Sequence, residues 1–178
     1  MHPKIIDAGS ILLQDTFDIP DQIKYPELED ELAELGGKLA ATVIKDFDYY
    51  WKNKTAQADV GISSSKKISK SDGIISFKLD SFETINRKIR ALSHQIPIKT
   101  VDLIPNKQVI LEDILLDLPL NFTSTNANNS TSVYYDKSIK AVLFPVQNGT
   151  IGVKRFKIEG KSQIFTAGSF YSNYLKNN

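Results

Sequence analysis

The chain has 178 residues, of which 41% are hydrophobic and 24% are charged, a composition typical of a globular protein with one good core or two small ones. It contains no cysteine and only two histidines, which excludes a disulfide framework, a catalytic thiol and a His/Cys metal site. No stretch approaches the roughly 20 apolar residues that a membrane-spanning helix needs, so neither a membrane nor a metal is expected as a partner.

The net charge of +1 conceals an alternation of acidic and basic blocks. Residues 1–61 carry 6 basic and 12 acidic side chains, whereas residues 62–100 carry 8 and 3. Residues 101–136 carry 1 and 5, and residues 137–178 carry 7 and 1. Two basic blocks in a nearly neutral chain predict a surface that faces a polyanion. The alternative is that the blocks are solvated faces that neutralise one another.

Two elements are predicted near the N-terminus. A run of Ile and Leu within 10–17 is typical of a short strand that is buried on both faces, as in a parallel sheet. Pro26, followed by several acidic residues, marks the first turn of a helix. Apolar residues of this helix recur at steps of three and four and form one stripe: Leu28, Leu32, Leu35, Leu39, Val43, Phe47 and Tyr50.

A linker and a second helix are expected next. From Lys52 to about Lys70 the sequence is polar and rich in Lys and Ser, which predicts a connection between two units. After a short strand at about 74–79, Asp80 is the expected N-cap of a helix, with Glu83 as its capping-box partner. This helix is expected to turn Arg87, Lys88 and Arg90 outward, opposite Phe82, Ile85, Ile89 and Leu92.

The remainder of the chain is predicted to be β structure. Strands are expected at about 98–103, 109–118, 133–135, 139–146 and 150–158, and the polar loop 119–132 is too poor in apolar groups to fold alone. Asn148-Gly149 is typical of a type I′ hairpin, and Thr166 is expected to start a short final helix. Several short strands at close spacing predict a small barrel.

Four segments, taken in order, resemble the methionyl-tRNA formyltransferase family along almost the whole chain. HPKIIDAGSILLQ (2–14) is similar to a loop and strand late in the family's catalytic domain, especially in its eukaryotic branch, and residues 28–47 are similar to the last long helix of that domain. Residues 67–92, with their Ile-x-x-Lys-Ile-Arg-Ala pattern, resemble the linker and first helix of the C-terminal domain. Residues 148–170 resemble its closing hairpin. The order and spacing of the four segments carry the resemblance.

The resemblance implies a fold and an activity. Residues 1–52 would be the end of a doubly wound α/β formyltransferase domain, 53–70 a linker, and 71–178 a small OB-like β-barrel domain that contacts tRNA. The implied reaction transfers a formyl group from 10-formyltetrahydrofolate to the amine of initiator methionyl-tRNA in translation initiation. The eukaryotic character of 2–14 implies the mitochondrial matrix, and a monomer is expected.

The implied chemistry needs a donor for a developing oxyanion and a carboxylate that manages protons. The family supplies an Asn-x-His pair and an Asp, and Asp7 matches that Asp by its place in Asp-Ala-Gly. The pair itself is absent, since Leu92 stands two residues before His94. The 178 residues are therefore expected to be a truncated chain that is inactive alone. The structural alternative for Asp7 is an Asp in a tight turn before Gly9.

The predicted tRNA-binding residues are basic side chains of the two basic blocks, namely Arg87, Lys88, Arg90, Lys154, Arg155, Lys157 and Lys161. Tyr134, Tyr135 and Phe156 are candidates for stacking on bases, and the alternative is that they belong to the core. Two other functions remain open. One is a non-catalytic nucleic-acid-binding barrel module, and the other is a different folate-dependent formyltransferase, such as an aminosugar enzyme.

Overall fold

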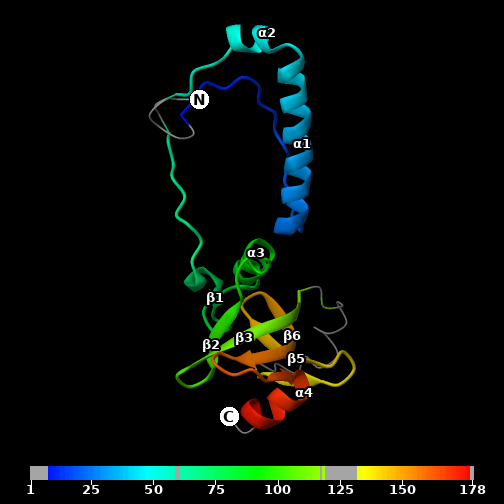
Figure 1. Ribbon diagram of the computed structural model, residues 1–178. Coiled ribbons are helices and arrows are strands. Elements are labelled where there is room, and N and C mark those ends of the chain that lie inside the picture. Colours follow the sequence, from blue (N-terminus) through cyan, green and yellow to red (C-terminus); the bar gives the residue numbers. More distant parts are fainter. Residues whose placement is uncertain (1–7, 59–60, 117, 119–131, 177–178) are drawn as a thin grey trace. The chain divides into compact units, whose positions relative to one another are not determined.

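The computed structural model describes residues 8–58, 61–116, 118 and 132–176. The chain divides into two compact units, Met1–Lys67 and Ile68–Asn178, and each is considered by itself (Figure 1). The predicted catalytic residue Asp7 lies outside the described residues, as does nearly all of the polar loop predicted at 119–132.

The first unit contains two helices, α1 (Tyr25–Lys45) and α2 (Phe47–Lys52). α1 begins close to the predicted position, and the Glu27 carboxylate accepts a hydrogen bond from the Lys24 backbone N–H at 3.0 Å. The helix predicted to run on to residue 50 is interrupted at Asp46, whose φ of −137° and ψ of 54° are not helical. The apolar periodicity of the sequence therefore continues past Asp46, although the helical conformation of the backbone is interrupted there.

The strand predicted over 10–17 is not formed. Ile11 exchanges backbone hydrogen bonds with Thr55 at 2.8 and 2.9 Å, and this isolated bridge is the only β pairing among the described residues of the unit. A strand that is buried on both faces needs neighbouring strands, so the predicted α/β remnant is present as helices alone. Accordingly no residue of α1 or α2 is buried, and Leu32 and Phe47 of the apolar stripe are 46% and 49% exposed.

The second unit contains a mixed sheet of the order β1-β2-β3-β6-β5-β4, with β7 paired to β6 (Figure 1). Its strands are β1 (Ile74–Ile75), β2 (Lys99–Ile104), β3 (Lys107–Leu115), β4 (Tyr134–Asp136), β5 (Ala141–Val146), β6 (Gly149–Ile158) and β7 (Ile164–Thr166). β1 is parallel to β2, and the other pairs are antiparallel. β6 is the central strand, because β3 pairs with one edge while β5 and β7 share the other.

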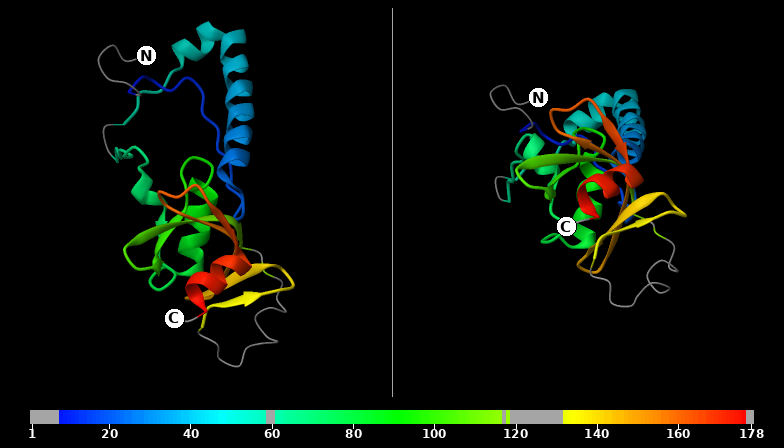
Figure 2. Two further views of the ribbon diagram at one scale, coloured as in Figure 1. Left: turned by 60° about the horizontal axis from the view of Figure 1, so that its bottom comes forward. Right: turned by 90° about the horizontal axis from the view of Figure 1, so that it is seen from below.

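The sheet is open, so the predicted OB-like barrel is not confirmed. Its path ends at β1 and β4, and within the described residues these two strands do not pair. They are only two and three residues long, too short to offer the row of backbone groups that closure needs. Two helices, α3 (Phe82–Leu92) and α4 (Ala167–Phe170), pack on the sheet. α4 continues into a π-helical turn, Tyr171–Leu175, and contacts β5, β6 and β7 (Figure 2).

α3 begins one residue later than predicted. Its N-cap is Ser81, whose hydroxyl accepts a hydrogen bond from the Thr84 N–H at 3.2 Å. Asp80, the predicted cap, instead accepts a hydrogen bond from the Ser76 N–H at 3.0 Å. This hydrogen bond closes the turn that follows β1, so the strand predicted at 74–79 ends at Ile75.

The hairpin predicted at Asn148-Gly149 joins β5 to β6, with its turn one residue earlier. Val146 pairs with Gly149, so the loop residues are Gln147 and Asn148, and Asn148 has a φ of 65°. Gly149 is needed because an added Cβ would lie 2.7 Å from the ring of Phe82. The Phe82 N–H also donates to the Gln147 carbonyl at 2.8 Å, so the hairpin turn rests on the start of α3.

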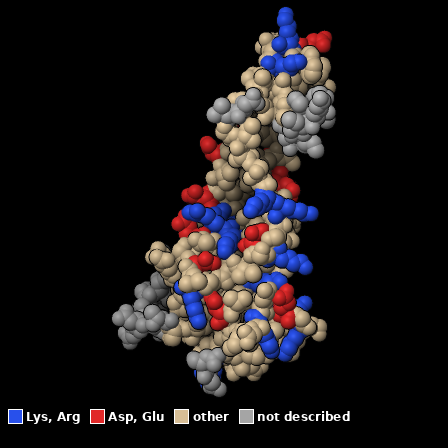
Figure 3. Space-filling view, turned by 90° about the vertical axis from the view of Figure 1, so that its left-hand side faces the viewer, with Lys and Arg blue, Asp and Glu red and all other residues tan. Residues whose placement is uncertain are grey.

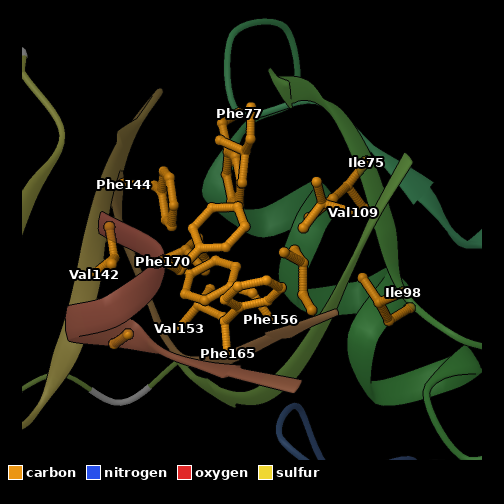
Figure 4. Packing of buried hydrophobic residues seen from close by; sticks show 14 of the residues in the cluster. Ile75, Phe77, Ile98, Val109, Val142, Phe144, Val153, Phe156, Phe165 and Phe170 are labelled. Carbon is orange, nitrogen blue, oxygen red and sulfur yellow. The ribbon is translucent and has the colours of Figure 1, made fainter. Parts of the chain in front are cut away.

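A series of aromatic rings forms the centre of this core (Figure 4). Phe77 stacks on Phe144 with centroids 4.1 Å apart, Phe144 meets Phe156 edge-on at 6.1 Å, and Phe156 stacks on Phe170 at 4.2 Å. Phe156 is 0% exposed, so it is a core residue and is not available for stacking on bases. Buried aliphatic side chains pack in the same cluster, among them Ile75, Ile85, Ile98, Val109, Val142 and Val153.

Replacing Phe156 by Ala is expected to lower the free energy of unfolding of the second unit by about 3–5 kcal/mol, because it removes a fully buried ring that contacts two others. Denaturant unfolding followed by near-UV circular dichroism measures the change. Phe47→Ala is the control, since a half-exposed ring in the first unit should alter this transition by no more than about 0.5 kcal/mol. Similar effects of the two substitutions would contradict this account of the core.

Candidate nucleic-acid interface

The predicted RNA-binding residues lie on α3, on β6 and in the turn that follows β6. Over the second unit, the face shown in Figure 3 carries Lys and Arg side chains interspersed with Asp and Glu. The availability of each cation therefore depends on its own neighbours, which differ between the three places.

Lys88 joins α3 to the first strand of the sheet. Its side chain is 33% exposed, and its amine donates a hydrogen bond to the Ile74 carbonyl at 2.9 Å. The same amine lies 3.5 Å from the Asp80 carboxylate. These contacts occupy the ammonium group and hold the helix to the edge of the sheet.

Arg87 and Arg90 have partners on their own helix. Arg87 is exposed and forms an ion pair with Glu83, one helical turn earlier. The Nε of Arg90 donates to the side-chain oxygen of Asn86 at 3.1 Å. An exposed pair at this spacing contributes only about 0.3–0.5 kcal/mol, so a phosphate can displace Glu83 from Arg87.

Arg155, on β6, is bound by two acidic residues of β3. Its guanidinium group contacts both carboxylate oxygens of Asp113, at 2.6 and 3.2 Å, and lies 3.7 Å from its cross-strand neighbour Glu112. The register passes from Glu112↔Arg155 to Ile114↔Val153 across Asp113, whose φ of 50° distorts β3 locally. The charge of Arg155 is thus neutralised within the sheet.

Lys154, Lys157 and Lys161 differ from the other predicted cations. In the part of the chain that the structure describes, their amines have neither an ion pair nor a hydrogen bond. Lys157 is paired across the sheet with Ile110 on one side and Ile164 on the other, so its nearest cross-strand neighbours are apolar. These three lysines keep their full charge available for a phosphate.

The two tyrosines of β4 are both half-buried and have different surroundings. Partial burial raises the pKa of Tyr134, and the nearby charge of Asp136 raises it further, so the phenol stays protonated at neutral pH. Tyr135 packs on Gly168, where an added Cβ would lie 3.3 Å from its ring, and its centroid lies 6.3 Å from that of Tyr171. Tyr135 is therefore a packing residue, whereas Tyr134 remains a candidate for stacking.

Sequence reasoning did not single out Lys99. This residue is 5% exposed, its amine forms an ion pair with the Glu159 carboxylate, and it donates to the side-chain oxygen of Gln108 at 3.3 Å. A lysine at the start of a strand is normally exposed, and its partner is 60 residues away along the chain. No local signal in the sequence could have shown this contact.

Asp7, the predicted catalytic carboxylate, lies outside the described residues. Within the residues that are described, no group of three or more His, Cys, Asp or Glu is placed to hold a metal ion. None of the helices in that part of the chain is long and apolar enough to cross a membrane.

Comparison with known proteins gives a consistent set of relatives. Residues 67–174 match the family described as "Formyl transferase, C-terminal domain". Over 184 residues the chain is 29% identical to the mitochondrial methionyl-tRNA formyltransferase of Homo sapiens, covering 98% of this chain and 45% of that protein. Over 98 residues it is 37% identical to the methionyl-tRNA formyltransferase of Alcanivorax borkumensis, covering 55% of this chain and 29% of that protein. The chain thus spans less than half the length of these relatives.

Solved structures of HypX from Aquifex aeolicus are similar in fold. One HypX variant gives a TM-score of 0.63 at 17% identity, covering 98% of this chain and 30% of that one. HypX in complex with tetrahydrofolic acid gives a TM-score of 0.64 at 16% identity, covering 96% of this chain and 29% of that one. At this level of identity the likeness concerns the fold alone.

Two lowered carboxyl pKa values predict that the second unit is acid-sensitive. Hydrogen bonds from Ser69 lower the pKa of Asp72. The pKa of Asp136 is lowered mainly by the hydrogen bond from the Ser138 hydroxyl and, to a smaller extent, by the hydrogen bond from the Ile139 N–H. Because the folded-state pKa lies below the unfolded one, this stabilisation is present at neutral pH and is lost as the pH falls through the folded pKa. Asp136→Asn is expected to flatten the pH dependence of thermal unfolding below about pH 4. A profile that keeps its wild-type slope would contradict this assignment.

Proposed function

This chain belongs to the formyl transferase family, whose C-terminal domain it carries at residues 67–174, and on that premise we propose that it is the carboxyl-terminal portion of a methionyl-tRNA formyltransferase. The proposed reaction of the whole enzyme is formyl transfer from 10-formyltetrahydrofolate to the amine of initiator methionyl-tRNA, in translation initiation. Curated relatives from human, cattle and Alcanivorax borkumensis, which bear this enzyme's name, support the proposal.

The proposed contribution of the described residues of this chain is to hold the tRNA rather than to transfer the formyl group. The regular elements among the described residues of the first unit are two helices, without the strand ends at which a doubly wound sheet would bind a folate. The sequence also lacks an Asn-x-His pair. A folate is the proposed formyl donor of the whole enzyme, and HypX, which is similar to this chain in fold, has been solved in complex with tetrahydrofolic acid.

The unpaired charges of Lys154, Lys157 and Lys161 carry the proposal that the second unit binds tRNA. Lysines near phosphates supply an affinity that is independent of sequence and falls with salt. The other predicted residues, Arg87, Lys88, Arg90 and Arg155, hold intramolecular partners. We assign Arg87, Lys88 and Arg90 a secondary part in binding, in which Arg87 is the most readily released, and we assign Arg155 to its intramolecular pairs alone.

The proposed location is the mitochondrial matrix, and the proposed state is a monomer bound to initiator methionyl-tRNA. The human, bovine and mouse relatives are named as mitochondrial enzymes, which supports the compartment. The same resemblance favours Asp7 as the catalytic carboxylate of the whole enzyme, at the start of the first unit.

The purified chain of 178 residues is expected to show no formylation of methionyl-tRNA, because its sequence lacks the Asn-x-His donors that would stabilise the oxyanion. Transfer of a labelled formyl group from 10-formyltetrahydrofolate measures this. The Alcanivorax borkumensis enzyme serves as the positive control. Measurable turnover by the chain alone would show that the donors lie elsewhere in these residues.

The full chain is expected to bind an initiator tRNA transcript with an affinity that falls as salt rises. If each of the three unpaired lysines meets one phosphate, the logarithm of the association constant should fall against the logarithm of salt with a slope of roughly −3. Fluorescence anisotropy at several salt concentrations measures the slope. Lys38→Gln is the control, because Lys38 lies in the first unit and is paired with Glu34. Binding that does not depend on salt would count against an electrostatic interface.

A further inference from the structure

Two turns lie side by side at one end of the sheet of the second unit. The β3–β6 ladder extends past the pair Val109↔Ile158, because the Glu159 N–H donates to the Gln108 carbonyl at 3.0 Å. The next residues outward are Lys107, which follows the β2–β3 turn, and Gly160, and Lys161 comes directly after Gly160 in the turn between β6 and β7, where its N–H donates to the Ile158 carbonyl at 3.0 Å. Two lysines distant in sequence are thus brought to one edge.

At this end of the sheet, the Glu159 carboxylate is paired with Lys99, a buried lysine from a third strand. Lys99 of β2 is 5% exposed, and its amine is bound by the Glu159 carboxylate and the Gln108 side-chain oxygen. Removing an ammonium group from water costs several kcal/mol unless an opposite charge and hydrogen bonds compensate it, so Glu159 is committed to Lys99. Glu159 is also the only acidic residue within 137–178. No other carboxylate of that segment can neutralise the lysines around it.

Three lysines at this end of the sheet therefore keep their charge, and we call Lys107, Lys157 and Lys161 the lysine tip. Within the described residues, none of their amines has an ion pair or a hydrogen bond. Lys157 has Ile110 and Ile164 as cross-strand neighbours, so its alkyl stem lies beside apolar side chains and its amine extends to solvent.

Arg155 provides the contrast on the same strand. It lies two residues before Lys157, and hence on the same face of β6. Its guanidinium group is held by Asp113 and faces Glu112 across the sheet. Two cations on one face of one strand thus differ in whether an acidic partner neutralises them.

We propose that the lysine tip is a phosphate-contacting part of the RNA interface, in addition to Lys154, and that Lys99 is a positioning residue that keeps Glu159 from pairing with the tip. This inference rests on the proposed function, adds Lys107 to the interface and gives the buried Lys99 a supporting role. The lysines of the tip present separate positive charges along one end of the sheet rather than around a pocket. Such an arrangement suits a polymer whose phosphates are variably spaced.

The first test compares Lys157→Gln with Arg155→Gln in the full chain, binding an initiator tRNA transcript at several salt concentrations. The two substitutions remove the same charge from the same face of β6. Lys157→Gln is expected to weaken binding and to reduce the magnitude of the salt slope by about one, and Lys107→Gln should do the same. Arg155→Gln should leave the slope unchanged. Equal effects of Lys157→Gln and Arg155→Gln, or a wild-type slope in Lys157→Gln, would overturn the assignment.

The outcome for the unsubstituted chain separates the two proposals. If it does not bind the transcript at low salt, the proposed tRNA-binding function itself fails. If it binds with a salt-dependent affinity that the lysine-tip substitutions do not change, the proposed function stands and the tip assignment fails. Thermal unfolding of each variant shows whether a loss of binding reflects a loss of fold.

The second test addresses the positioning role of Lys99. Lys99→Met removes the buried charge and releases Glu159, which is then free to pair with Lys157 or Lys161, so tRNA binding should weaken. The double variant Lys99→Met/Glu159→Gln removes the released carboxylate and should restore wild-type affinity and salt slope. A folded double variant that binds as weakly as Lys99→Met would overturn the role of Lys99, while the comparison on β6 would still test the tip.

Discussion

The stacking of Phe156 on Phe170 is the contact on which the second unit depends most. Phe156 lies on β6, which pairs with β3, β5 and β7, and Phe170 lies on α4, so the two rings fix the last helix to the central strand. Phe144 and Phe77 continue the series to β5 and to the turn after β1. Such pairs add about 0.5–1.5 kcal/mol each to the area they bury. Because side chains alternate along a strand, fixing the inner face of β6 through Phe156 also fixes its charged outer face.

Cross-strand neighbours then decide which charges of that outer face are available. Arg155 meets Glu112 and Asp113, and the left-handed backbone of Asp113 brings its carboxylate to the guanidinium group. Lys157, two residues later, meets Ile110 on the same partner strand. The register of β3 against β6 is set by buried pairs such as Leu111↔Phe156. Core packing therefore determines which surface charges are paired, because a shift of the β3–β6 register by one residue would give both cations different cross-strand neighbours.

The parts of the fold that could be predicted from the sequence are those with local causes. The stripe of α1, the amphipathic face of α3 and the Thr166 cap of α4 each depend on residues within a few positions of one another. The failures are non-local. The strand predicted at 10–17 lacks neighbours, and closure of a barrel fails because β1 and β4 are short. The cap of α3 is an exception with a local cause, because Asp80 accepts a hydrogen bond from Ser76, four residues earlier, rather than from the helix.

The candidate site could be predicted only in part. Neutralisation between charge blocks applies to Lys99 and Arg155, whose partners come from another block, whereas the lysine tip has no such partner among the described residues, and its binding to a polyanion stays a prediction. Glu112 and Asp113 are used by Arg155, while Asp102 accepts a hydrogen bond from Ser76 and Asp136 accepts two from Ser138. Residues 137–178 hold seven cations and one anion, and that anion is bound to Lys99, a cation from outside the segment. Among the described residues, the positive charges of the lysine tip are therefore not paired within the chain.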